Sequence, residues 1–83
     1  MSDKQKLDEI TRTALGLTKH ADLSSIAYGK TAEWDSVAHL QLMAAIEDGF
    51  GISLGGDEVG SATDHAAICR VLSSHGLKLD QPE

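Results

Sequence analysis

Apolar residues recur at helical spacing in three separate stretches of this chain, and that periodicity constrains its fold more than any other feature. The members of each stretch lie three or four residues apart for the most part: Leu7, Ile10, Ala14 and Leu17; Leu42, Ala45, Ile46 and Phe50; and Ile68, Val71 and Leu72. Such spacing places apolar side chains along one face of a helix, whereas the alternation typical of a half-buried strand is absent from the sequence. We therefore predict an all-α fold.

Capping residues and glycines divide the chain into elements. We predict helices over residues 3–15 and 36–48, the second with Asp35 as its N-cap, and a short helical turn over 57–61. A last helix follows, capped by Thr63 or Asp64 and ended by Gly76, with Leu77 placed for a Schellman motif. The prediction is thus a four-helix bundle of three main helices and one short helix, with a long loop from about residue 18 to residue 33.

Length and composition narrow the class of protein. Residues 1–83 make one small domain, with a modest core and ends (1–2 and 77–83) that we expect to be frayed. Cys69 is the only cysteine, so no intramolecular disulfide can form, and we expect it to be half-buried or in the core. The polar N-terminus and the lack of a long apolar run predict a soluble protein without membrane insertion. The single cysteine suits a reducing cytoplasm, and we expect a cytoplasmic monomer.

Negative charge is concentrated in the middle of the chain. The net charge is -6, which argues against nucleic-acid binding because that binding depends on Lys and Arg neutralising phosphates. Between Thr31 and Cys69 there are seven acidic residues and no Lys or Arg. This segment is either an ordinary solvated surface or a surface that attracts a basic partner.

The predicted second helix carries apolar residues on two opposite faces. One is the core stripe that begins at Leu42. The other, here called the second stripe, consists of Val37, Leu40 and Ala44; Met43 lies between the two, and Glu47 and Asp48 lie beside the second. A small domain cannot bury both faces of one helix. The second stripe is therefore either a set of single exposed apolar residues or a docking surface for partner proteins.

Ser36, at the start of this helix, lacks the local sequence of a catalytic nucleophile. No glycine flanks it, and none of His20, His39, His65 or His75 has an evident orienting acid in the sequence. His65 and His75 are not spaced as metal ligands, so we expect no metal site and no enzymatic activity. The first turn of a helix stabilises the negative charge of an attached phosphate. Two interpretations of Ser36 therefore remain: a residue that only starts the helix, or a serine that carries a modification.

Asp35-Ser36-Val37, at the start of the second helix of a short acidic helical chain, resembles the D-S-L motif of acyl carrier proteins. The similarity covers nearly the whole chain and is greatest over the segment WDSVAHLQLMAAIEDGFGISL, residues 34–54. The resemblance implies that Ser36 carries 4′-phosphopantetheine, transferred from coenzyme A by a phosphopantetheinyl transferase. Acyl groups would then be carried as thioesters on the thiol of that arm.

The resemblance also assigns roles to other residues. It implies that five residues form a recognition surface: Val37, Leu40, Ala44, Glu47 and Asp48. This surface would be recognised by the phosphopantetheinyl transferase. It would also be recognised by acyl-loading and acyl-processing enzymes, which are synthases and transferases with basic surfaces. It implies core positions, some of which line an acyl-chain cleft in certain carriers: Leu42, Ile46, Phe50, Leu54, Ala62 and Ile68.

Some residues depart from the pattern of fatty-acid carriers. Ala38, His39 and Gln41 replace part of the usual run of acids, and Trp34 is more typical of carriers in polyketide or other specialised pathways. The Gly-Gly-x-Ser signature of peptidyl carriers is absent. Two alternatives remain: an unmodified helical interaction module that binds through the second stripe, and a protein phosphorylated on Ser36 by a kinase.

Overall fold

The computed structural model describes residues 3–18 and 20–77, and this part of the chain is helical without a named strand. Its elements are α1 (Asp3–Leu15), the 3-10 helix η1 (Leu23–Ser25), α2 (Ser36–Phe50), α3 (Gly56–Ser61) and α4 (His65–Ser74). The predicted all-α architecture, with three main helices, one short helix and a long first loop, is confirmed.

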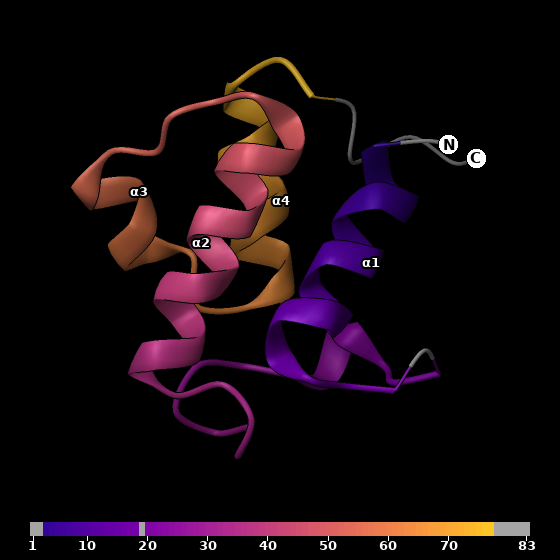
Figure 1. Ribbon diagram of the computed structural model, residues 1–83. Helices are drawn as coiled ribbons and strands as arrows, with labels where there is room; N and C mark the ends of the chain where they lie inside the picture. Colours follow the sequence, from indigo (N-terminus) through magenta and orange to yellow (C-terminus); the bar gives the residue numbers. More distant parts are fainter. Residues whose placement is uncertain (1–2, 19, 78–83) are drawn as a thin grey trace.

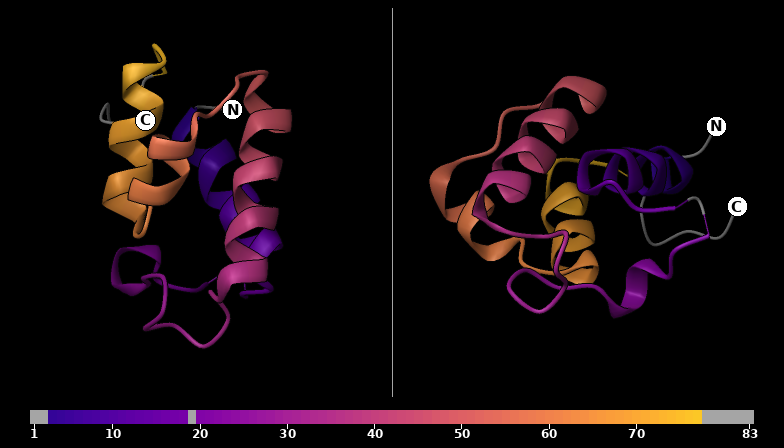
Figure 2. Two further views of the ribbon diagram at one scale, coloured as in Figure 1. Left: turned by 90° about the vertical axis from the view of Figure 1, so that its left-hand side faces the viewer. Right: turned by 60° about the horizontal axis from the view of Figure 1, so that its bottom comes forward.

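The three main helices form a bundle, and the short α3 lies beside α2 and α4 on the side away from α1 (Figures 1 and 2). α1 packs directly against α2. The loop between them crosses the end of the bundle at which α2 begins (Figure 1). The start of α2 and the second half of this loop are therefore at the same end of the molecule.

Aspartate side chains start two of the main helices. Asp35 Oδ1 accepts a hydrogen bond from the Ala38 N–H at 2.8 Å, and Asp64 Oδ1 accepts one from the Ala67 N–H at 2.8 Å. Each satisfies a backbone donor that has no partner within its helix. Asp35 is thus the predicted N-cap, and Asp64 rather than Thr63 caps α4.

α2 continues to Phe50, two residues beyond its predicted end. Gly49 remains helical and lies where α1 approaches: a Cβ atom at Gly49 would be 2.6 Å from Ile10 Cδ1. The left-handed residue that ends the helix is instead Gly51, with φ of 66°, and its N–H and that of Ile52 both bond to the Glu47 carbonyl. α3 begins at Gly56, one residue before its predicted start.

The C-terminal end of α4 is a complete Schellman motif, as predicted. The Leu77 N–H donates to the Leu72 carbonyl at 3.1 Å, and the Gly76 N–H donates to the Ser73 carbonyl at 3.0 Å. Leu77 is partly buried and packs against the core. Residues 1–2 and 78–83, expected to be frayed, lie outside the described residues.

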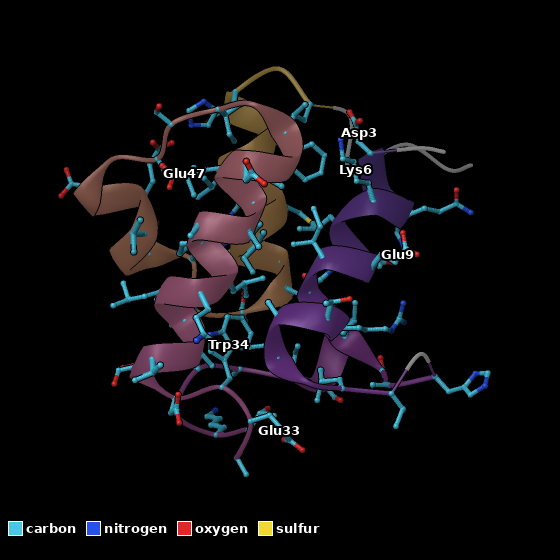
Figure 3. All side chains as sticks on the ribbon, viewed as in Figure 1. Asp3, Lys6, Glu9, Glu33, Trp34 and Glu47 are labelled. Carbon is cyan, nitrogen blue, oxygen red and sulfur yellow. The ribbon has the colours of Figure 1, made fainter. Side chains whose placement is uncertain are left out.

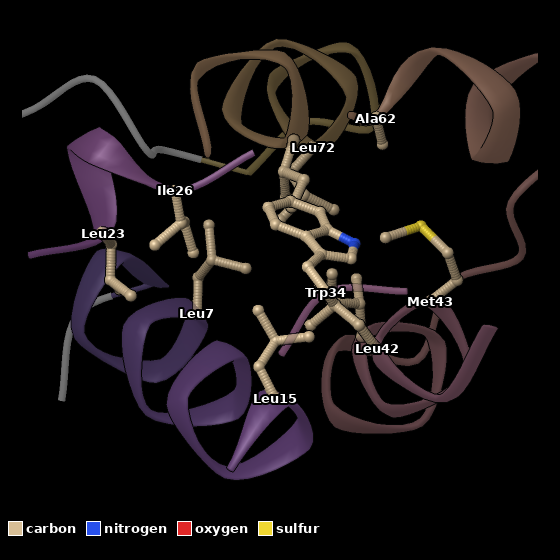
Figure 4. Packing of buried hydrophobic residues seen from close by; sticks show 11 residues of the cluster. Leu7, Leu15, Leu23, Ile26, Trp34, Leu42, Met43, Ala62 and Leu72 are labelled. Carbon is tan, nitrogen blue, oxygen red and sulfur yellow. The ribbon is translucent and has the colours of Figure 1, made fainter. Parts of the chain in front are cut away.

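Trp34 is the largest fully buried side chain of the described residues, with no exposed surface. Figure 4 shows its indole in the middle of a cluster to which α1, α2 and α4 contribute. The predicted core positions Leu42, Ile46, Ala62 and Ile68 are buried, and Phe50 and Leu54 are partly buried. Met43, expected between the two stripes, is 3% exposed and belongs to the core, because the bundle closes around that side of α2 as well.

Candidate functional site

The loop that leads into α2 is held by its own backbone hydrogen bonds. The Tyr28 N–H donates to the Thr63 carbonyl at 2.8 Å, which attaches the loop to the connection between α3 and α4. The Gly29 N–H donates to the Trp34 carbonyl at 3.2 Å, and the Trp34 N–H donates to the Thr31 carbonyl at 2.9 Å. This closed segment directs the Trp34 side chain into the bundle and fixes the position at which Ser36 begins the helix.

Ser36 is the first residue of α2 and is exposed. Among the described residues its hydroxyl has no hydrogen-bond partner, while the carboxylate of the preceding Asp35 is turned toward the Ala38 N–H. The hydroxyl therefore lies at the positive end of a 15-residue helix and is open to solvent. A phosphodiester on this oxygen fits the site, because backbone N–H groups and the helix dipole both stabilise its negative charge.

His39, one turn along α2, cannot act as a base for Ser36. The Trp34 Nε1–H donates to His39 Nδ1 at 3.0 Å, so Nδ1 is an acceptor and the ring proton lies on Nε2. His39 Nε2 then donates to the Val59 carbonyl at 2.8 Å. Both nitrogens of this buried imidazole are occupied, and the ring connects the loop, α2 and α3.

Two further histidines have acidic partners, contrary to the expectation from sequence. His65 Nε2 lies 3.0 Å from Asp8 Oδ1, and His75 Nε2 lies 2.8 Å from Glu58 Oε2. Neither acid was evident in the sequence because Asp8 is 57 residues from His65 and Glu58 is 17 residues from His75. The His65–Asp8 pair connects α4 to α1, and the His75–Glu58 pair connects the end of α4 to α3. Neither pair involves Ser36.

The second stripe is exposed beside Ser36. Val37 is 64% exposed and Leu40 is 63% exposed, and Ala44 and Asp48 are exposed further along the helix. These two large apolar side chains on the surface agree with the predicted division of α2 into a buried and an exposed face.

Glu47 differs from the rest of the predicted recognition surface. Its Oε2 accepts a hydrogen bond from the Leu54 N–H at 2.8 Å, and the residue is only partly exposed. Figure 3 places Glu47 on α2 beside the chain that leads to α3, whereas Glu33 lies near the loop at the opposite end. Glu47 therefore holds the α2–α3 connection, and of the two acids beside the second stripe Asp48 is the more exposed.

A shallow depression of about 220 Å³ lies next to the first turns of α2. Its lining comes from the loop, α2, α3 and the α3–α4 connection: Tyr28, His39, Val59, Gly60 and Thr63. One of these lining residues, His39, lies one helical turn after Ser36 on α2. The lining is mostly apolar, and the Tyr28 ring contacts the His39 ring edge-on with centroids 5.2 Å apart.

The described residues contain no group of three metal-ligating side chains, and no helix among them is long and apolar enough to cross a membrane. Comparisons of the chain with protein-family models, with curated proteins and with solved structures found no match.

Proposed function

We propose that this protein is a discrete acyl carrier protein, with Ser36 as the attachment site of 4′-phosphopantetheine. The observation that carries the proposal is an exposed serine hydroxyl at the N-terminus of α2, directly followed by the exposed apolar Val37 and Leu40. The resemblance of residues 34–54 to the carrier family supports the same assignment. The pathway is proposed to be polyketide, specialised fatty-acid or related biosynthesis, on the basis of Trp34 before the motif.

Attachment needs chemistry that the described residues around Ser36 lack. The Ser36 oxygen forms a bond to the pantetheine-bearing phosphorus of coenzyme A, the pyrophosphate bond breaks, and adenosine 3′,5′-bisphosphate leaves. His39 is engaged on both nitrogens and cannot take the serine proton. A separate phosphopantetheinyl transferase must supply the base and stabilise the leaving group.

When attached, the arm supplies the thiol on which an acyl group is carried as a thioester. The chain's own contribution is presentation and recognition. Asp35 caps the helix that holds Ser36, and Val37 and Leu40 provide apolar contact area next to it. The exposed acids Glu33, Asp35 and Asp48 would attract partners with basic surfaces, and this attraction would weaken with salt.

The test is modification in vitro. The purified chain is incubated with coenzyme A and a broad-specificity phosphopantetheinyl transferase, and its intact mass is measured. A gain of one phosphopantetheine, lost in Ser36→Ala and retained in Ser53→Ala, is the expected result. Ser53 is a suitable control because it is also exposed but lies after α2.

A second pair of variants tests the docking surface. We expect Leu40→Glu to slow modification about tenfold, because it replaces an apolar contact with a charge. Gln41→Glu adds the same charge at the adjacent exposed position outside the second stripe, and we expect it to have little effect. Equal rates for both variants and the wild type would show that the second stripe is ordinary surface.

The exposed Val37 and Leu40 also favour a second candidate, an interaction module that is never modified. An unchanged mass after incubation with the transferase would support this candidate and reject the carrier. A mass gain of one phosphate, found after incubation with a kinase and lost in Ser36→Ala, would indicate the phosphorylated alternative.

A further inference from the structure

A carboxylate from α1 contacts an imidazole from α4, and that imidazole contacts a thiol on the same helix. His65 Nε2 is 3.0 Å from Asp8 Oδ1, and His65 Nδ1 is 3.8 Å from Cys69 Sγ. The Asp8 and His65 side chains are 17% and 16% exposed, and Cys69 is partly buried. Nothing in the proposed carrier function uses this cluster.

When Asp8 is ionised and His65 is neutral, these contacts fit one arrangement of protons. An ionised Asp8 can only accept, so the ring proton of neutral His65 lies on Nε2. The Nδ1 lone pair then faces Cys69, and the thiol is the donor in that contact. Lys4 Nζ lies 3.4 Å from the other oxygen of Asp8.

A carboxylate that contacts an imidazole, which in turn contacts a thiol, is the arrangement that activates a thiol. A base next to a thiol removes its proton, and a third group that orients the base stabilises the cation that forms. His65 and Cys69 are four residues apart on α4 and so lie on one face of that helix, whereas Asp8 is brought to them by packing of α1.

We propose that Cys69 is a reactive thiol that exchanges with small disulfides, with His65 as its base and Asp8 as the positioning residue for that base. In the step, the Cys69 proton moves to His65 Nδ1 and the thiolate attacks one sulfur of the disulfide. A new S–S bond forms at Cys69, the S–S bond of the reagent breaks, and the leaving thiolate takes up one proton. Cys69 thereby becomes a site of reversible mixed-disulfide modification, separate from the Ser36 site.

His65 lies beside two surface depressions, neither of which has Cys69 in its lining. The depressions, of about 330 and 290 Å³, both include His65 in their lining. The charged groups that line them with His65 come from α1, the long loop and the N-cap of α4: Lys4, Asp8, Arg12, Asp22, Lys30 and Asp64. These carry both signs of charge, so a neutral reagent is the suitable probe.

His75 and Glu58 provide a matched control. They form the same kind of imidazole–carboxylate contact, at 2.8 Å, but their contact involves no thiol. His75→Gln therefore removes a comparable contact between elements while leaving the cluster at Cys69 in place. If the loss of a contact between two elements were enough to change the reactivity of Cys69, His75→Gln should change it too.

The experiment measures the rate of reaction with 4,4′-dithiodipyridine, followed by release of thiopyridone, from about pH 5 to pH 9. Cys69 is the only cysteine, so the rate refers to one thiol. We expect the folded chain to react about fivefold faster at neutral pH than the urea-unfolded chain, because the thiolate is the attacking species.

We expect His65→Gln to lower the rate at neutral pH about fivefold and to move the pH–rate midpoint upward. Asp8→Asn, which can still accept the Nε2 proton but has no charge, should give a smaller shift in the same direction, and His75→Gln should give none. Circular dichroism verifies that each variant is folded. The proposal is overturned if His65→Gln matches the wild type and His75→Gln at every pH, or if the folded chain reacts no faster than the unfolded one.

Discussion

Replacing Trp34 by Phe tests whether the Trp34–His39 hydrogen bond organises the site. The substitution keeps an aromatic ring in the core but removes the indole N–H, which donates to His39 Nδ1 at 3.0 Å. His39 is 7% exposed, so Nδ1 would lose its partner in a buried place. Water cannot easily replace the donor there.

The expected loss of stability can be estimated from these contacts. An unsatisfied buried acceptor costs about 1–3 kcal/mol, and the space left by the smaller ring adds about 1 kcal/mol, since complete truncation of a buried Trp costs about 3–5 kcal/mol. We therefore expect a loss of about 3 kcal/mol, which is a large share of the roughly 4–12 kcal/mol typical of a chain of this length. The melting temperature should fall by about 12–24 °C.

The assay is urea unfolding followed by far-ultraviolet circular dichroism, in a double-mutant cycle with His39→Leu. His39→Leu removes the acceptor of the indole N–H and also leaves the Val59 carbonyl without its partner. The cycle isolates the shared hydrogen bond, and we expect a coupling energy of about 1–2 kcal/mol between the two positions. Additive effects, within about 0.5 kcal/mol, would refute the role assigned to this bond.

The remaining predictions concern helix ends and pH, and urea unfolding measures all three. Asp35→Ala removes the cap on Ala38 and should cost about 1 kcal/mol; an unchanged stability would mean that the cap does not matter. Gly51→Ala forces a side chain into φ of 66° and should cost about 1–2 kcal/mol, whereas Gly56→Ala, within α3 and with no atom near its Cβ position, should not destabilise the fold. The Gly55 N–H, and then the His75 side chain, lower the pKa of Glu58 below 4.5. Its contribution to stability is therefore present above about pH 4.5 and lost as the pH falls through the lower folded pKa. Glu58→Gln should lose less stability than the wild type on acidification, and parallel profiles would contradict this.

Local sequence signals were sufficient for most of the secondary structure. α1 has the predicted bounds, Asp35 caps α2 as expected, and Gly76 with Leu77 ends α4 in the predicted motif. These features depend on residues within about one helical turn of one another, so their interactions are visible in the order of residues. The exposed second stripe was predictable for the same reason.

The position of Trp34 was not predicted. A single tryptophan in a loop with few other apolar residues is a signal for a side chain that anchors the loop, whereas the motif alone connects Trp34 only with a type of pathway. Its burial depends on hydrogen bonds that close the loop on itself and attach it to Thr63. His39 likewise gained its role from Val59, which is 20 residues away on α3.

The sequence by itself determined the order of the helices, most of their ends, the exposed second stripe of α2, and that Ser36 follows a capping aspartate. The tertiary structure decided which polar groups meet: Trp34 with His39, His39 with the Val59 carbonyl, and Asp8 with His65. The reason is physical. Caps and helical periodicity are short-range, whereas a buried imidazole or thiol acquires its chemistry from groups that packing brings from other helices.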